Sequence, residues 1–444
     1  MAVLIQRGRS PEPSPDGNRE LRQYRVVPRR RLAIAIMLAV LSASARAAGG
    51  QDARPFVIVV DRDMTPVAGT IDLLTVQRAF VAVEDRWLPP ARFDESTRVK
   101  RGLGIGYRAG KWFALDLPQD HFLMVVGHEV FGHGARLREI GAHGVEYGFD
   151  APIPYGAGGA VTEFSGDLLV TRTDALAIDT SGIEAQNVLA EHINREAVAS
   201  GALHYREAWL YLESRLDGLR YIRSVSPRSS PGHDVRSFLL DFNDQCDPPA
   251  CEPLDAATLK RRALVMLGDP MLAYAGYAWA AAYMVHGRTT GPVPTIPLPR
   301  DLRYLPAVRF EMTPYGTAVT TDHTIVRHGH LTNVSIGVGD TGAARAWDVG
   351  VTSGDVLRGR RLNAGASIRL WRQPELDAPP NAQVMKTGVL AAGTLRVALP
   401  EAVASGRAGV LVEAGYKSDG FVRGERLHAG PIVRAGVVIR HSHD

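Results

Sequence analysis

The sequence predicts an α+β protein, in which a mainly helical domain precedes an antiparallel β-sheet or small β-barrel domain. Three observations predict this class. Residues 118–140, 182–224 and 256–286 have helical patterns with few breakers. Residues 291–306 contain five prolines and are typical of a linker. Beyond them, apolar residues recur at every second position, which is the period of a β-strand. The predicted boundaries are therefore 48–290 for the helical domain and 307–444 for the β domain.

Composition allows an ordinary globular protein with two domains. The chain has 444 residues, of which 45% are apolar and 22% are charged. The net charge of +4 is small for this length, and arginines near the N-terminus supply much of it. A nucleic-acid partner is therefore not indicated.

The first 47 residues predict a signal peptide with an N-terminal extension. Arg29, Arg30 and Arg31 precede an apolar run at 32–41, and the Ala-Arg-Ala at 45–47 fits a signal-peptidase site. The run is shorter than the roughly 20 apolar residues that a membrane anchor needs. We therefore expect an exported protein, located in the periplasm or outer membrane of a Gram-negative bacterium.

Within the helical domain, the order of elements begins with a strand at 55–61. A hairpin is expected at 98–117 with its turn near Arg108-Ala109-Gly110, followed by the helix 118–140. Residues 154–164 form a glycine-rich loop. The apolar stretch 272–285 begins after Asp269-Pro270, which favours a buried helix over a membrane span.

The β domain shows about seven or eight alternating segments. They centre on 308–312, 334–338, 347–351, 366–370, 395–399, 410–416 and 433–439. Membrane barrels show the same alternation, but they also carry aromatic girdles, and residues 301–444 hold seven aromatics. We expect a water-soluble or membrane-associated domain, with association with the outer membrane as an open alternative.

Two cysteines, Cys246 and Cys251, enclose the residues Asp-Pro-Pro-Ala. In an oxidising compartment such a pair can close as a disulfide. Zinc knuckles usually have two to four intervening residues and need a second cysteine pair for the metal. A loop disulfide or two free thiols is therefore expected.

The segment MVVGHEVFGHGARLREIG, residues 124–141, carries the strongest chemical signal. His128 and His133 are five residues apart, which is about 140° around an ideal helix. A single π-type turn would bring both rings to one face, and such turns are frequent at functional sites. Gly132 stands where the extra residue must be accommodated. We therefore predict a π-bulge or kink near residues 131–132.

These residue types suit a metal-dependent hydrolase. Neutral imidazoles bind zinc, and a catalytic zinc has three protein ligands and a water. Glu129, beside the first histidine, is placed to act as general base. The alternative is a helix that contains two unrelated histidines.

The stretch His-Glu-Val-Phe-Gly-His resembles the H-E-x-x-G-H motif of the dipeptidyl peptidase III family of zinc peptidases. The resemblance implies His128 and His133 as zinc ligands and Glu129 as general base. In that family the third ligand is a glutamate on a second helix, about fifty residues further on. Glu184 lies 51 residues after His133, but the family's double glutamate is absent here. Three rivals for the third ligand are Glu163, Glu191 and His192.

Other polar residues are candidates for supporting roles. Glu191 or His192 would orient a ligand, and a tyrosine or histidine would stabilise a tetrahedral intermediate. The candidates for that donor are His143, Tyr147, Tyr155, Tyr221 and His233. Zinc peptidases often bind substrate along an edge strand, and the hairpin expected at 98–117 would offer one.

The sequence thus predicts an exported zinc-dependent metallohydrolase, a peptidase acting on peptides or proteins. Two alternatives stay open. One is a non-enzymatic envelope protein with a β-barrel-like domain and a structural metal or none. The other is a metal-dependent hydrolase of a different bond, because the chemistry of zinc and water is shared among them.

Overall fold

A computed structural model of the chain describes residues 2–3 and 54–439, apart from residues 94, 151–158, 166, 167, 169, 231, 245, 247, 360, 377–383 and 401–407. The predicted signal segment 1–47 therefore lies outside the described residues, except for residues 2–3. The first part of the predicted glycine-rich loop, with Tyr155, also lies outside them.

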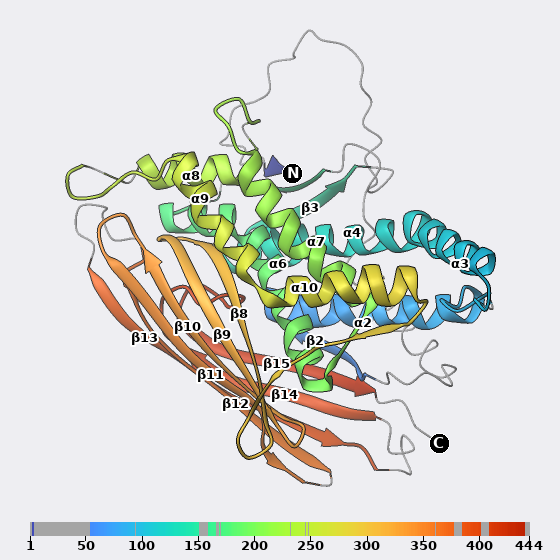
Figure 1. The fold of residues 1–444 in the computed structure, drawn as a ribbon. Coiled ribbons are helices and arrows are strands. Elements are labelled where there is room, and N and C mark those ends of the chain that lie inside the picture. Colours follow the sequence, from blue (N-terminus) through green and yellow to red (C-terminus); the bar gives the residue numbers. More distant parts are fainter. Residues whose placement is uncertain are drawn as a thin grey trace.

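One large antiparallel sheet and a group of helices on its concave side make up the molecule (Figure 1). The ten strands follow the order β2-β15-β14-β13-β12-β11-β10-β9-β8-β7. Their bounds are Phe56–Asp61 (β2), Ile296–Leu298 (β7), Leu302–Thr313 (β8), Gly316–Arg327 (β9), His330–Asp340 (β10), Arg345–Arg358 (β11), Leu362–Pro374 (β12), Met385–Ala398 (β13), Ala408–Lys417 (β14) and Gly430–Ile439 (β15). The predicted α+β class and antiparallel sheet are confirmed, and the sheet is open rather than closed into a barrel.

Two small sheets lie among the helices. One has the order β1-β4-β3, with bounds Ala2–Val3, Ala160–Ser165 and His143–Phe149. The other pairs β5 (Ala202–His204) with β6 (Thr290–Pro292). Strand β6, strand β7 and the start of β8 therefore lie within the segment predicted as a linker.

The helices come in three groups along the chain. The first group is α2 (Pro66–Trp87), α3 (Arg98–Lys111), η1 (Trp112–Asp116), α4 (Leu117–Val126), η2 (Gly127–His133) and α5 (Gly134–Glu139). The second is α6 (Arg172–Ser200), α7 (Tyr205–Ser224) and α8 (Asp234–Asp244). The third is α9 (Ala256–Ala263), η3 (Leu264–Gly268), α10 (Pro270–Gly276) and η4 (Tyr277–Val285). Helix α6 contacts strands β8, β9 and β10 of the sheet and the helices α2, η2, α5, α7 and α8.

The hairpin predicted at 98–117 is wrong, because this segment is helical. The hydroxyl of Thr97 caps α3 by accepting from Lys100 N at 3.2 Å. The buried face of α3 includes Arg108 and Lys111, which bind Met284 O at 3.0 Å and Asp116 Oδ1 at 2.6 Å. These tertiary partners outweigh the turn preference of the glycines in this segment.

The helix predicted over 182–224 is two helices in the structure. Gly201 ends α6 with φ +74°, a backbone conformation that favours glycine, and the chain turns through β5 into α7. The prediction over 118–140 holds, whereas 256–286 is interrupted at Asp269, whose backbone is extended, and ends in the π-helical η4. The apolar segment 272–285 is buried along one face, whereas Tyr277 and Val285 are 46% and 41% exposed.

Candidate metal centre

The histidine helix contains the predicted π-type turn. Seven residues, Gly127–His133, form η2 within a helix that continues on both sides. The wider turn brings His128 and His133 together, so that their ring centroids are 4.9 Å apart. The expectation that the five-residue spacing requires a π-bulge is confirmed.

Two glycines let η2 and α6 approach closely. A Cβ at Gly132 would lie 2.7 Å from Ser181 O and 2.8 Å from the Cα of Gly182. A Cβ at Gly182 would lie 2.1 Å from Nε2 of His128. Gly132 was expected to supply backbone freedom, but its backbone is helical and the structure shows that it supplies space.

The motif forms a buried group that could hold a metal ion. One ligand atom each from His128, Glu129 and His133 lies within 4.8 Å of the others, and all three residues have 0% exposure. Burying such polar groups without partners is costly. Nε2 of His133 and Oε1 of Glu129 nonetheless make no hydrogen bond with the described residues.

Asp234, the first residue of α8, completes the arrangement. Its Oδ2 lies 3.2 Å from Nε2 of His128 and 3.3 Å from Nε2 of His133. A tetrahedral zinc site with bonds of about 2.0–2.1 Å has ligand–ligand separations of about 3.3 Å. The two separations from Asp234 Oδ2 are therefore those expected between ligands of one small cation, and the contact with His128 is also a hydrogen bond.

The surroundings fix the orientation of the histidine rings. Nδ1 of His133 lies 2.8 Å from Ile178 O, so it carries the proton and its Nε2 is left as the ligand atom. Metal-binding histidines usually donate their second ring N–H in this way. Ser181 Oγ, 3.1 Å from the same Nδ1, adds a second contact from α6.

The electrostatics of the group also favour a cation. Burial disfavours charge on both His133 and Asp234, yet their attraction raises the pKa of the imidazole and lowers that of the carboxyl. Asp179 lies nearby on α6, where burial and the neighbouring Asp241 and Asp234 hold its pKa well above the usual value. The site thus favours the charged carboxylate of Asp234 and disfavours that of Asp179.

Glu129 is held by strand β4. Its Oε2 accepts a hydrogen bond of 2.6 Å from the hydroxyl of Thr162. This contact leaves Oε1, the oxygen without a partner, to act on a proton. Residue 3 pairs with Thr162 across the other edge of β4, so an extended segment can lie beside Glu129.

No family model, curated protein or solved structure matches this chain. The similarity to the dipeptidyl peptidase III family therefore stays a prediction that depends on one short motif.

The structure does not bring Glu184 to the histidine pair. The Glu184 carboxylate binds the guanidinium of Arg136 at 2.8 and 2.9 Å and accepts from Gly424 N at 2.6 Å. Burial raises the pKa of Glu184, although Arg136 opposes this shift. A buried carboxylate is costly without a cationic partner, and Arg136 is that partner for Glu184.

The three rivals for the third ligand also lie elsewhere. Glu163 is exposed on β4. Glu191 pairs with Arg195 and Arg423, within an ion network between α6 and the sheet. His192 contacts the hydroxyl of Thr70 at 3.0 Å, so neither Glu191 nor His192 supports a histidine of the motif.

Of the predicted donors, Tyr221 and His233 reach the site. The Tyr221 hydroxyl accepts from Asp234 N at 3.0 Å, and its ring stacks on His233 at 4.2 Å. Burial raises the pKa of Tyr221, so the phenol stays protonated. Tyr147 instead contacts Arg138 at 2.6 Å, and His143 is exposed at the start of β3.

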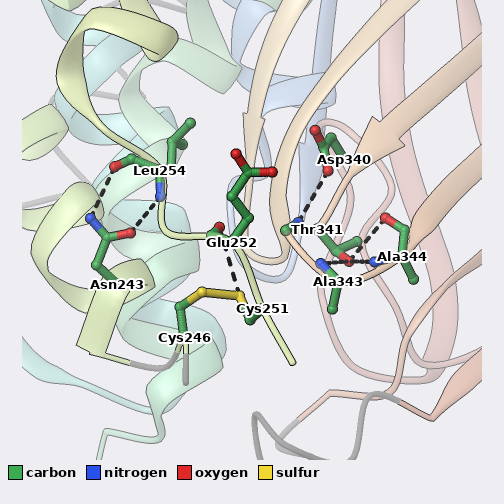
Figure 2. The surroundings of a disulfide bond; sticks show 10 residues. Asn243, Cys246, Cys251, Glu252, Leu254, Asp340, Thr341, Ala343 and Ala344 are labelled. Atoms are coloured by element: carbon green, nitrogen blue, oxygen red, sulfur yellow. Dashed lines mark hydrogen bonds between the residues drawn. A yellow bond between two sulfur atoms is a disulfide. The ribbon is translucent and has the colours of Figure 1, made fainter. Parts of the chain in front are cut away.

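The predicted loop disulfide is confirmed between Cys246 and Cys251, whose Cα atoms are 5.1 Å apart (Figure 2). The hydrogen bond from Glu252 N to Gly342 O, 2.9 Å, ties the same loop to the turn after β10. Because this loop follows α8, both contacts restrain the helix that begins with Asp234.

Proposed function

We propose that the protein is a zinc-dependent peptidase with His128, His133 and Asp234 as metal ligands and Glu129 as general base. The observation that carries the proposal is the spacing of three buried ligand atoms next to a carboxylate oxygen without a partner. Asp234 replaces Glu184, which we expected from the motif resemblance.

The donor set favours zinc over other divalent cations. Two imidazole nitrogens and one carboxylate oxygen form a combination that is common in catalytic zinc sites. Calcium and magnesium prefer six or more oxygen ligands. When bound, zinc supplies a Lewis acid that polarises a carbonyl group and lowers the pKa of water toward neutrality.

The protein residues have distinct tasks. Thr162 holds Glu129 through Oε2, so that Oε1 can accept a proton from water and return it to the leaving amine. Tyr221 places a protonated hydroxyl beside Asp234 and can donate to a developing oxyanion. His133 is oriented by Ile178 O.

A peptide is favoured as substrate because of strand β4. Its outer edge pairs with residues 2–3 in parallel, and Val3 lies opposite Thr162. An extended polypeptide can use the same backbone groups, which is a recurrent way of recognising peptides. Strand β4 takes the role that we expected of residues 98–117.

The complete burial of the motif favours a second function, a structural metal site. Closed sites with four protein ligands stabilise folds, whereas catalytic sites keep one position open. In this alternative, Glu129 would be a fourth ligand.

The test compares purified wild type with single variants, measuring zinc content and cleavage of an unstructured peptide mixture. Glu129→Gln should retain zinc and lose cleavage by about 10²- to 10⁴-fold, because it removes the base and keeps the ligands. His128→Ala and Asp234→Ala should lose zinc. Glu163→Gln, a change on the exposed side of β4, is the matched control.

Two results would overturn the proposal. Purified wild type without stoichiometric zinc at neutral pH would exclude the metal centre. Zinc-loaded wild type without cleavage, combined with weaker zinc binding in Glu129→Gln, would establish the structural site instead.

A further inference from the structure

From β10 to β15 the large sheet exposes apolar residues on its outward face, whereas its inward face carries ion pairs beside buried apolar residues such as Leu411 and Trp371. On the outward side Val349 pairs with Leu370, and these residues are 41% and 46% exposed. On the inward side, the alternate residues Asp348 and Arg369 form an ion pair at 3.1 Å. The same inversion holds on neighbouring strands, where inward-facing Arg434 binds Glu413.

This arrangement is the reverse of that in a soluble protein. A sheet with one solvated face normally buries apolar residues against the core and exposes polar ones. Here inward-facing Arg309 of β8 forms an ion pair with Asp322 of β9 and, at 3.5 Å, with Glu191 of α6. Membrane sheets alternate in this way, with apolar side chains outward and polar side chains inward.

The outward face has no charge over a broad area. One row of directly paired residues crosses five strands from β12 to β2, and it consists of Ala364, Leu395, Val412, Ala435 and Val60. A second row crosses from β10 to β13, with Ile336, Val349, Leu370 and Val389. Exposed apolar surface of this extent marks an interaction site.

The area has the smallest number of residues per strand that a membrane strand needs, and its height is somewhat less than the apolar band of about 25 Å in membrane barrels. The outward positions are uncharged over nine residues in each of four strands, at 362–370, 389–397, 408–416 and 431–439. Nine residues extend about 27 Å along a strand, and a tilt of about 40° reduces this to about 20 Å. Membrane strands need about 9–11 tilted residues.

Polar and aromatic residues border the area at both ends. Trp347 of β11 and Tyr416 of β14 lie at the same end of their strands, and Trp347 pairs with Arg372 and is two residues from Arg345. At the other end, the exposed charged residues are Arg358, Arg361 and Arg396. Aromatic residues and arginines gather where a membrane protein meets the lipid headgroups.

The edge next to this area is covered. The backbone N–H groups of Val57 and Val59 in β2 donate to Thr75 and Asp72 of α2, at 2.9 and 2.8 Å. This matters because unpaired strand edges do not occur in hydrocarbon. Helix α2 is itself long and apolar enough to cross a membrane by length and composition, although 44% of its apolar window is buried in the protein.

We propose that the outward face of β10–β15 and β2 is embedded in the hydrocarbon of a lipid bilayer. A protein partner would be expected to meet large anchors such as Trp or Arg near the centre of its interface. The centre of this face instead contains small and aliphatic residues, among them Ala366, Gly393 and Ala414, and its aromatic residues lie at the end.

Spin labels at single introduced cysteines can test the proposal in the full-length protein. Both native cysteines are in the disulfide, so a new cysteine is labelled selectively. Ile368→Cys and Leu395→Cys place labels on the outward face. Ser367→Cys faces inward beside Ile368, and Leu240→Cys, at a position 58% exposed on α8, is the matched control on the helices.

The labelled proteins are reconstituted in vesicles of phosphatidylcholine and phosphatidylglycerol. Collisions of each label with oxygen, which concentrates in hydrocarbon, are compared with collisions with a water-soluble nickel chelate. We expect the oxygen-to-nickel ratio to be several-fold higher at residues 368 and 395 than at residue 240. The label at residue 367 should be shielded from both reagents.

Two outcomes would overturn the proposal. Nickel access at residues 368 and 395 equal to that at residue 240 would show a water-exposed face. Shielding of residues 368 and 395 from both reagents in a vesicle-free, detergent-free dimer would show that a second copy covers the face. Neither outcome would affect the zinc-peptidase proposal.

Discussion

Gly182 offers a way to disturb the metal centre without changing a ligand. A Cβ at this position would lie 2.1 Å from Nε2 of His128 and 2.3 Å from Cε1 of the same ring. Non-bonded atoms need about 3.5 Å, so Gly182→Ala must displace the ring by about 1.4 Å. Zinc ligands tolerate deviations of about 0.2 Å, so His128 would no longer reach the metal in the wild-type position.

We therefore expect Gly182→Ala to weaken zinc binding by at least about 100-fold. Loss of a residue that only hydrogen-bonds a metal ligand already lowers affinity by about 10- to 100-fold, and here the ligand itself is displaced. Helix propensity alone would favour alanine by about 1 kcal/mol, so loss of helix is not the cause. Gly110→Ala is the control, because a Cβ there has no neighbour within 4 Å.

The assay is a competition titration with a coloured zinc chelator, combined with circular dichroism to verify folding. The expected result is a folded Gly182→Ala protein with weak zinc binding and a Gly110→Ala protein with wild-type affinity. If Gly182→Ala binds zinc as tightly as wild type, the assignment of His128 as a ligand in this geometry is refuted.

Two further predictions concern residues that we first associated with the metal. Glu184→Gln removes one of the two carboxylates that bind the buried Arg136, the other being Glu139, so the free energy of unfolding should fall by about 1.5–3 kcal/mol while folded protein keeps its zinc. Denaturant titration and metal analysis test this, and loss of zinc from folded protein would contradict it. Burial lowers the pKa of His192 from 6.5 to about 4, so protonation favours the unfolded chain and stability falls as pH falls through this interval. His192→Gln should make that fall shallower in unfolding curves, and an unchanged slope would refute the assigned cause.

The motif geometry was predictable because the chemistry constrains the backbone. Two histidines that must share a metal cannot be five residues apart on a regular helix, so the π-turn followed from the spacing of His128 and His133. The strands beyond residue 300 were predictable for a similar reason. Apolar residues recur there at every second position, and the extended backbone of a β-strand places such residues on one face. Which face of the sheet, apolar or polar, packs against the helices was not predictable. The alternation of apolar and polar residues is the same in soluble and membrane strands.

Asp234, which we propose as the third ligand, could not be found from the sequence. Asp234 stands at the start of a helix, where an acidic residue is favoured by the helix dipole in any protein. Only the packing of α8 beside α6 brings it to the histidines. The prediction of Glu184 was wrong although its distance from His133 in the sequence matched the motif. Its carboxylate binds Arg136, which lies 48 residues away in sequence, and the motif gave no sign of this contact.

The pairing of β2 with β15 sets the order in which the molecule can be assembled (Figure 1). Asp61 and Arg434, which form an ion pair at 3.3 Å across these strands, are 373 residues apart. During synthesis β2 therefore emerges long before β15, its neighbour in the sheet. Contacts between residues so far apart in sequence form slowly, and the edge of β2 stays unpaired until β15 has been synthesised. The helices that carry His128 and Asp234 are therefore complete in sequence long before the sheet that supports α6 can close beneath them.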